Sequence, residues 1–137
     1  MSTPAALGLP RWHALAKSRD TSALGEMIAQ DAVFRSPAVH TPQAGHDVVA
    51  LYLTGAVNVL GEHLEYLDEW VRERDAILEF RTRIGDVEIS GIDRITWDEA
   101  GRIVDFTVLI RPLKALNTVI EKMGEELTRL VAEVTPD

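Results

Sequence analysis

The stretch from Ile77 to Pro112 alternates between apolar and polar residues, a period of two that is typical of β-strands with one buried face. Two turn signals divide it. Gly85-Asp86 is a two-residue hairpin signal, and Asp98-Glu99-Ala100-Gly101 is a longer turn with glycine where a left-handed residue is usually needed. The pattern therefore predicts three consecutive antiparallel strands.

The two turns also predict how these strands pair. If Ile84 pairs with Val87 and Trp97 pairs with Arg102, both turns place apolar residues on the same sheet face. A slip by one residue would turn every side chain over, so this agreement supports the register. The predicted face consists of Leu78, Phe80, Thr82, Ile89, Gly91, Asp93, Ile95, Val104, Phe106, Val108 and Ile110. On the opposite face the predicted charge pairs are Arg83 with Glu88 and Arg94 with Asp105.

Asp93 is the one carboxylate on this apolar face. The predicted register places it between Leu78 on one neighbouring strand and Phe106 on the other. Apolar neighbours disfavour the charged form of a carboxyl group and raise its pKa. Asp93 is therefore predicted to be a buried acid. The alternative is a structural carboxylate that binds a loop N–H or an arginine.

Further elements flank this three-stranded region. Pro10 suits the first turn of a helix, because its missing N–H costs nothing there. In residues 64–72 the alternation leaves open whether Tyr66 and Trp70 or Leu67 and Val71 face inward. The predicted elements are a flexible lead at 1–9, helices at 11–17, 23–29 and 48–60, strands at 31–37 and 64–72, a loop at 38–45 and an amphipathic helix at 113–133.

Length and composition are those of a single domain spanning residues 1–137. The chain has no cysteine and no run of about 18 apolar residues that would cross a bilayer. Its start lacks the basic region and apolar core of a secretory signal, so we expect a cytoplasmic protein with no membrane partner. The net charge of -8 argues against nucleic-acid binding.

Helices followed by a short strand, a helix and a run of antiparallel strands form an α+β pattern. Together with DAVFRSP, Gly45 at the head of a helix, and GIDRITWDEAGRIVDF, this order resembles a family of cone-shaped proteins. The family contains nuclear transport factor 2, ketosteroid isomerase and the SnoaL-type polyketide cyclases. The resemblance covers about residues 12–112. It implies a cystatin-like curved antiparallel sheet wrapped around helices, with 113–133 as an extension.

The resemblance also implies roles for individual residues. Asp93 falls where the ketosteroid isomerases have a protonated aspartate in the oxyanion hole. Ser36 occupies the position of their general base and Trp12 that of their oxyanion tyrosine, and neither side chain can exchange a proton in the same way. Steroid isomerisation by that mechanism is therefore disfavoured.

Two related chemistries can be compared in the same way. The limonene epoxide hydrolases have an inward arginine where this chain has Gly91, and the nearby Arg94 and Asp105 are predicted to face outward. Their mechanism is therefore disfavoured too. In the polyketide cyclases a lone acidic residue can serve as acid or base, which Asp93 allows.

The resulting hypothesis is a protein that binds a small, mostly apolar molecule in a cone-shaped cavity. It is an isomerase-, cyclase- or hydrolase-like enzyme with Asp93 as catalytic acid, or a non-catalytic ligand-binding or dimeric interaction protein. No cofactor is expected, and no metal, because the four histidines lack the spacing of metal ligands. The resemblance implies a homodimer through the convex sheet face. The predicted ligand-binding residues are Trp12, Ser36, Tyr52, Phe80, Phe106, Val108 and Ile110.

Overall fold

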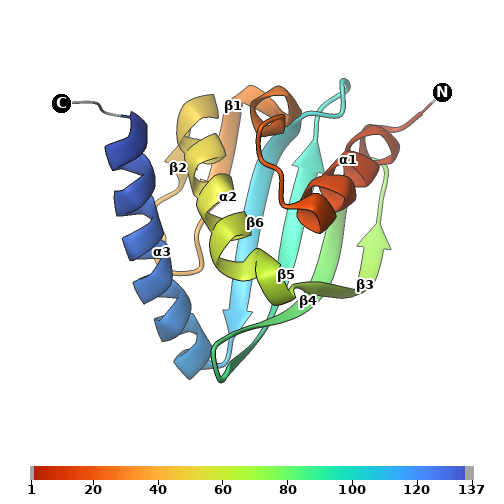
Figure 1. The fold of residues 1–137 in the computed structure, drawn as a ribbon. Helices are drawn as coiled ribbons and strands as arrows, with labels where there is room; N and C mark the ends of the chain where they lie inside the picture. Colours follow the sequence, from red (N-terminus) through yellow and green to blue (C-terminus); the bar gives the residue numbers. More distant parts are fainter. Residues whose placement is uncertain (1, 135–137) are drawn as a thin grey trace.

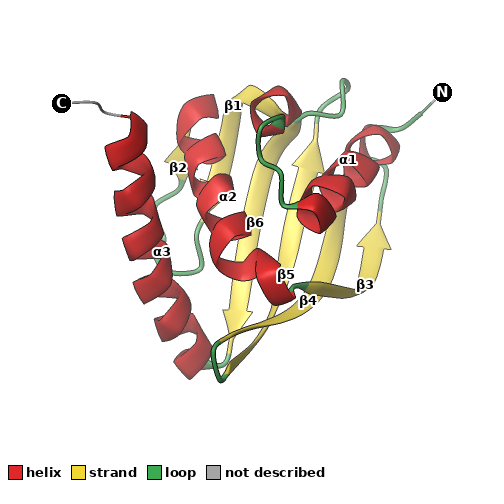
Figure 2. Ribbon diagram, viewed as in Figure 1, coloured by secondary structure: helices red, strands yellow, loops and turns green. Residues whose placement is uncertain are grey.

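The computed structural model describes residues 2–134 (Figure 1). Helices and strands are arranged as in the predicted α+β pattern, with all the helices on one side of a single curved sheet (Figure 2). In chain order the elements are α1 (Pro4–Ser18), η1 (Leu24–Met27), β1 (Ile28–Arg35), β2 (Gln43–Ala44), α2 (His46–Leu60), η2 (Gly61–His63), β3 (Glu65–Val71), β4 (Asp75–Ile84), β5 (Val87–Trp97), β6 (Ile103–Arg111) and α3 (Leu113–Val134).

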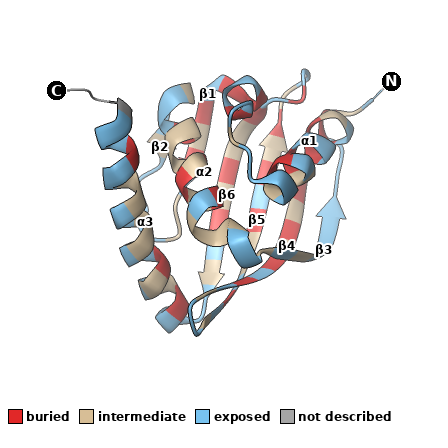
Figure 3. Cartoon of the chain, in the orientation of Figure 1, coloured by how far each residue is buried: buried red, intermediate tan, exposed pale blue. Residues whose placement is uncertain are grey.

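The strands form one sheet in the order β2-β1-β6-β5-β4-β3. The three-stranded antiparallel region β4-β5-β6 is confirmed. The whole sheet is mixed rather than antiparallel, because β1 runs parallel to β6. Buried residues lie along the central strands and on parts of the helices (Figure 3), and together they form one core between the sheet and the helices.

The first predicted turn is confirmed and the second differs. Ile84 lies opposite Val87, as predicted. At the second turn the N–H of Asp98 donates to the carbonyl of Arg102, and the Asp98 side chain accepts from the N–H groups of Ala100 and Arg102. Arg102 therefore pairs with Asp98 and not with Trp97, one residue later along the chain than predicted. Gly101 has the predicted left-handed conformation, at φ 77°.

This turn and a β-bulge beside Trp97 shift β6 along β5. Asp93 lies opposite Leu78, as predicted, but its other neighbour is Val108 and not Phe106. Likewise Arg94 lies opposite Thr107 rather than Asp105. The shift amounts to two positions along most of the strand, so the predicted inner face survives there. Nearer the turn, Trp97 lies opposite Ile103 and not Arg102. Ile103 is buried there, whereas Val104, which was predicted on the inner face, is only half-buried.

The amino-terminal helix begins earlier than predicted. Thr3 caps it by accepting a hydrogen bond from the N–H of Ala6, and Pro4 occupies the first turn. Ala5 is buried and its N–H donates to Glu73 in the turn between β3 and β4. The prediction of a flexible lead is therefore wrong for residues 4–9; residue 1 lies outside the described residues. Pro10 lies inside the helix instead of starting it.

Smaller corrections concern the segments before α2. The predicted helix at 23–29 is only the 3-10 turn η1, and β1 begins directly after it at Ile28. The predicted loop at 38–45 contains the short strand β2, and α2 begins at His46. The predicted closing helix is confirmed as α3.

Strand β3 does not keep a simple alternation. A bulge between Tyr66 and Asp68 changes which side chains face inward. Tyr66 lies opposite Phe80 on the concave face, whereas Trp70 lies opposite Ile77 on the convex face and is 55% exposed. The two residues therefore belong to different faces, although their spacing suggested the same one.

Candidate functional site

A cavity of about 230 Å³ lies between the concave sheet face and the helices. Its walls come from α1, α2, α3 and the central strands, and they are mainly aliphatic and aromatic. The eight residues singled out from the sequence all line it: Asp93, Trp12, Ser36, Tyr52, Phe80, Phe106, Val108 and Ile110. Their predicted roles in binding or catalysis remain predictions.

Phe80 owes its position in this wall to the glycine opposite it on β5. A β-carbon built on Gly91 would lie 2.6 Å from the Phe80 ring, so the ring occupies space that only glycine leaves free. The position where the epoxide hydrolases carry an arginine is thus filled by an aromatic ring. An arginine does not fit there without moving Phe80.

Asp93 is the centre of the polar part of the cavity. It lies in the middle of β5 between Leu78 and Val108, and it is only 7% exposed. The hydroxyl group of Tyr66 donates a hydrogen bond of 2.6 Å to Oδ2 of Asp93. The indole N–H of Trp12 donates in turn to the Tyr66 oxygen, at 2.9 Å. A chain of directed hydrogen bonds therefore runs from α1 through β3 to β5.

Burial determines the protonation of this group. Loss of solvation raises the pKa of the Asp93 carboxyl to about 7, although the hydrogen bond from Tyr66 favours the charged form. Burial also raises the pKa of Tyr66 well above 10, and the nearby Asp93 charge adds to this. Near neutral pH, Asp93 therefore exists in both protonation states while Tyr66 stays neutral.

The second carboxyl oxygen of Asp93 is available to a ligand. Tyr66 binds Oδ2, and Oδ1 has no hydrogen-bond partner among the described residues. Every fully buried side-chain oxygen and nitrogen of the described residues has a partner, so the unpartnered Oδ1 keeps some exposed surface. Because Asp93 lines the cavity, this accessible oxygen faces it. A protonated Oδ1 can donate a hydrogen bond to a bound acceptor.

Two of the other polar groups at the site make hydrogen bonds within the protein. Trp12, predicted as a ligand-binding residue, donates its indole N–H to the Tyr66 oxygen. The Ser36 hydroxyl accepts from the N–H of Ala38 in its own turn. The ring of Tyr52 stacks on Phe34, with 5.3 Å between centroids. Trp12 therefore contributes an apolar wall and orients Tyr66.

The sequence pattern left the side that Tyr66 faces open, and it did not predict that residues of α3 line the cavity. Tyr66 is hidden by the bulge in β3, and only its pairing with Phe80 shows that it faces inward. From α3, the cavity is lined by Val119, Ile120, Met123, Gly124 and Leu127. The apolar spacing of α3 predicts a packed face but does not say that the face covers a cavity.

No second charged group supports Asp93 among the described residues that line the cavity, and no histidine does so. His13, next to Trp12, contacts Glu69 at 2.8 Å and is partly exposed. Within residues 2–134 no group of three potential ligands is arranged to hold a metal ion. The same residues include no helix long and apolar enough to cross a membrane.

Comparisons with solved structures support the fold. A steroid delta-isomerase from Pseudomonas aeruginosa is 40% identical, with 96% of this chain and 97% of that chain covered and a TM-score of 0.89. A protein with a cystatin-like fold from Silicibacter pomeroyi is 28% identical over 92% and 86% of the two chains, with a TM-score of 0.80.

A nuclear transport factor 2-like protein from Mesorhizobium loti has the same fold. It is 18% identical, with 80% of this chain and 91% of that chain covered and a TM-score of 0.70. Neither a protein-family model nor a curated protein matches the sequence. The agreement in fold over nearly the whole chain, at 40% identity to one member, shows that the chain belongs to the nuclear transport factor 2-like superfamily.

Proposed function

We propose that this protein binds a small, uncharged, largely apolar molecule in its cavity and activates an oxygen atom of that molecule with Asp93 as a buried acid. One observation carries this proposal: a carboxyl group with a pKa of about 7 presents a free oxygen to an otherwise apolar cavity. Such a pKa is suited to proton transfer near neutral pH.

The chemistry of the walls limits the ligand class. Among the described lining residues there is no lysine, arginine or histidine to neutralise a carboxylate or phosphate. An anionic ligand would also meet the Asp93 charge at short range. A ketone, lactone or similar carbonyl compound avoids both penalties and accepts a hydrogen bond from protonated Asp93. The cavity volume of about 230 Å³ is below the roughly 300–1,000 Å³ of many ligand pockets, so a larger ketone such as a steroid would be enclosed only in part.

The relation to the Pseudomonas isomerase makes steroid ketones suitable probes. Moving a double bond in such a compound also requires a group that takes a proton from carbon. Ser36 stands where ketosteroid isomerases have that base, and no other carboxylate of the described residues lines the cavity. We therefore propose activation by a single acid, which needs no cofactor, rather than isomerisation by an acid and a base.

The pH dependence of ketone binding tests this proposal. If protonated Asp93 donates to the carbonyl oxygen, affinity is constant well below pH 7 and falls roughly tenfold per pH unit above it, because ionisation removes the donor. Calorimetric titration with the steroid ketone 4-androstene-3,17-dione between pH 5.5 and 9 measures this. Asp93→Asn keeps a hydrogen-bond donor and is expected to bind with no such dependence.

Deuterium uptake from heavy water at the carbon atoms beside the carbonyl separates an enzyme from a binding protein. Exchange that wild type accelerates and Asp93→Asn does not would support the acid role. Ketone affinity that stays constant or rises from pH 7 to pH 9 would contradict it. A protein that binds the ketone but accelerates no exchange would be the non-catalytic ligand-binding alternative.

We also propose that the protein forms a homodimer through the convex sheet face. Trp70 and Leu109 are each 55% exposed there, beside the half-buried Ile77 and Ile92. Apolar side chains among charged neighbours such as Arg94 suit a self-complementary interface.

Sedimentation at micromolar concentration is expected to show a dimer for wild type and a monomer for Leu109→Arg, because the new charge would be buried between copies. Glu121→Arg, on the exposed side of α3, is the matched control and should remain dimeric. A monomeric wild type at this concentration would remove the proposal.

A further inference from the structure

The cavity meets solvent between α3 and the loop after β1. Val39 in that loop and Ile120 in α3 both line the cavity, and yet they are 53% and 43% exposed. Gly124, one helical turn beyond Ile120, also lines the cavity and is exposed. Deeper wall residues such as Leu53 and Phe80 are buried. Residues that belong to the cavity and touch solvent mark its mouth.

Gly124 is not required by packing. A β-carbon built there would meet no heavy atom within 4 Å apart from its chain neighbours and the backbone of its own helix, although the residue lies in the interior of a 22-residue helix. Glycine at such a position is unfavourable relative to alanine, because it loses more backbone freedom on folding. Its missing side chain leaves a gap in the rim between Ile120 and Leu127, which lie on the same helix face.

Gly55 in α2 shows what a packing glycine looks like in this protein. A β-carbon there would lie 3.2 Å from the Met123 methyl carbon and 3.5 Å from a Leu127 methyl carbon. Gly55 therefore allows α2 and α3 to approach closely. Gly124, on the same pair of packed helices, faces open space instead.

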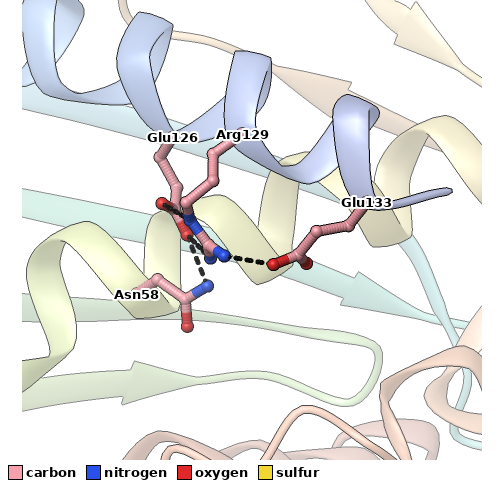
Figure 4. Close-up of polar contacts among 4 residues, drawn as sticks. All are labelled: Asn58, Glu126, Arg129 and Glu133. Atoms are coloured by element: carbon pink, nitrogen blue, oxygen red, sulfur yellow. Dashed lines mark hydrogen bonds and ion pairs between the residues drawn. The ribbon is translucent and has the colours of Figure 1, made fainter. Parts of the chain in front are cut away.

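One hydrogen bond joins α3 to α2 beside this gap, and further polar contacts lie within α3 itself. The Asn58 amide of α2 donates to Glu126 at 2.7 Å, and Arg129 donates to Glu126 at 2.7 and 2.8 Å (Figure 4). Arg129 also donates to Glu133 at 2.5 Å. The bond from Asn58 joins α3 to α2 within one turn of Gly124, so the gap is present in the fold described here without any movement of α3.

We propose that ligands enter and leave the cavity between α3 and the 37–39 loop, and that Gly124 is a specificity-determining residue that sets the size of this entrance. A ligand whose oxygen reaches Asp93 then has its far end at the gap, where no side chain limits its length. This inference rests on the proposed binding function for its physiological ligand, but entry itself does not depend on Asp93.

The test uses Nile red, an uncharged apolar dye, and stopped-flow fluorescence. Gly124→Leu fills the gap and is expected to lower the association rate constant roughly tenfold or more without lowering the melting temperature, since leucine favours helix. Glu121→Leu, an exposed change in the same helix, should leave the rate unchanged. An unchanged rate in Gly124→Leu would overturn the proposal.

Thiol labelling gives a second readout that does not depend on Gly124→Leu folding. The chain has no cysteine, so Ile120→Cys and Glu121→Cys each introduce a single reactive thiol. Bound dye is expected to slow maleimide labelling at position 120 at least severalfold and not at 121. Equal rates at both positions, with and without dye, would overturn the proposal. Slower entry in Gly124→Leu, combined with pH-independent ketone binding, would retain the entrance and reject Asp93 as the acid.

Discussion

Replacement of Asp93 by asparagine is expected to stabilise the folded protein increasingly as the pH rises. Burial raises the pKa of Asp93 from 3.8 to about 7 in the folded state. Below pH 3.8 the carboxyl is protonated in both states and the raised pKa has no effect. Between these values the unfolded state loses its proton first, so wild-type stability falls as pH rises, and it stops falling above pH 7.

The full difference between the folded-state and unfolded-state pKa of Asp93 corresponds to roughly 4 kcal/mol of unfolding free energy. Asparagine does not ionise, so its own burial cost does not depend on pH. The stability of Asp93→Asn relative to wild type should therefore increase by roughly 2–3 kcal/mol between pH 5 and pH 8.5. Urea unfolding at the two pH values measures this change. Asp86→Asn, at an exposed turn position, is the control and should show no comparable increase.

The direction in which the relative stability of Asp93→Asn changes with pH decides whether Asp93 is a buried acid or a structural carboxylate. A structural carboxylate stabilised by its partners has a normal or lowered pKa, and its loss destabilises the protein most at high pH. Carbon NMR of the Asp93 carboxyl gives the pKa directly. A value near 4, together with destabilisation of Asp93→Asn at pH 8.5, would show that Asp93 is a structural anchor.

Replacement of Val108 by tryptophan is expected to abolish small-molecule binding. Val108 lies directly opposite Asp93 and is almost fully buried in the cavity wall, so a larger side chain occupies the space beside the carboxyl group. We expect the affinity for the steroid ketone to fall at least a hundredfold, equivalent to about 2.7 kcal/mol. Overpacking is expected to cost about 1–3 kcal/mol of stability.

Leu109→Trp is the matched control, because the adjacent side chain points to the convex face and is exposed. Calorimetry should show that this variant binds the ketone like wild type. Unchanged binding in Val108→Trp would place the ligand outside the cavity. If no small molecule raises the melting temperature of wild type and a protein partner binds Val108→Trp normally, the protein is an interaction module.

The position of Asp93 on an apolar sheet face follows from the sequence alone. The two-residue turn at Gly85-Asp86 is a local structure, and it determines the pairing of β4 with β5 and hence the contact of Asp93 with Leu78. The pairing of β5 with β6 differs from the predicted register by two positions along most of β6. Since side chains alternate with a period of two, an even slip changed the neighbour but kept the face. For this reason the predicted residues of β6 still line the cavity.

Tertiary structure decided what surrounds that carboxyl group. The bulge in β3 brings Tyr66 inward, and no local signal for a bulge distinguishes it from simple alternation. Trp12 donates to Tyr66 and not to a ligand because α1 packs across the sheet, starting at a cap and a contact with Glu73 that sequence spacing does not show. The sequence alone therefore determined which face carries the acid. Contacts between distant segments decided which hydrogen bonds it makes, how strongly burial raises its pKa and where the cavity opens, since each depends on several elements at once.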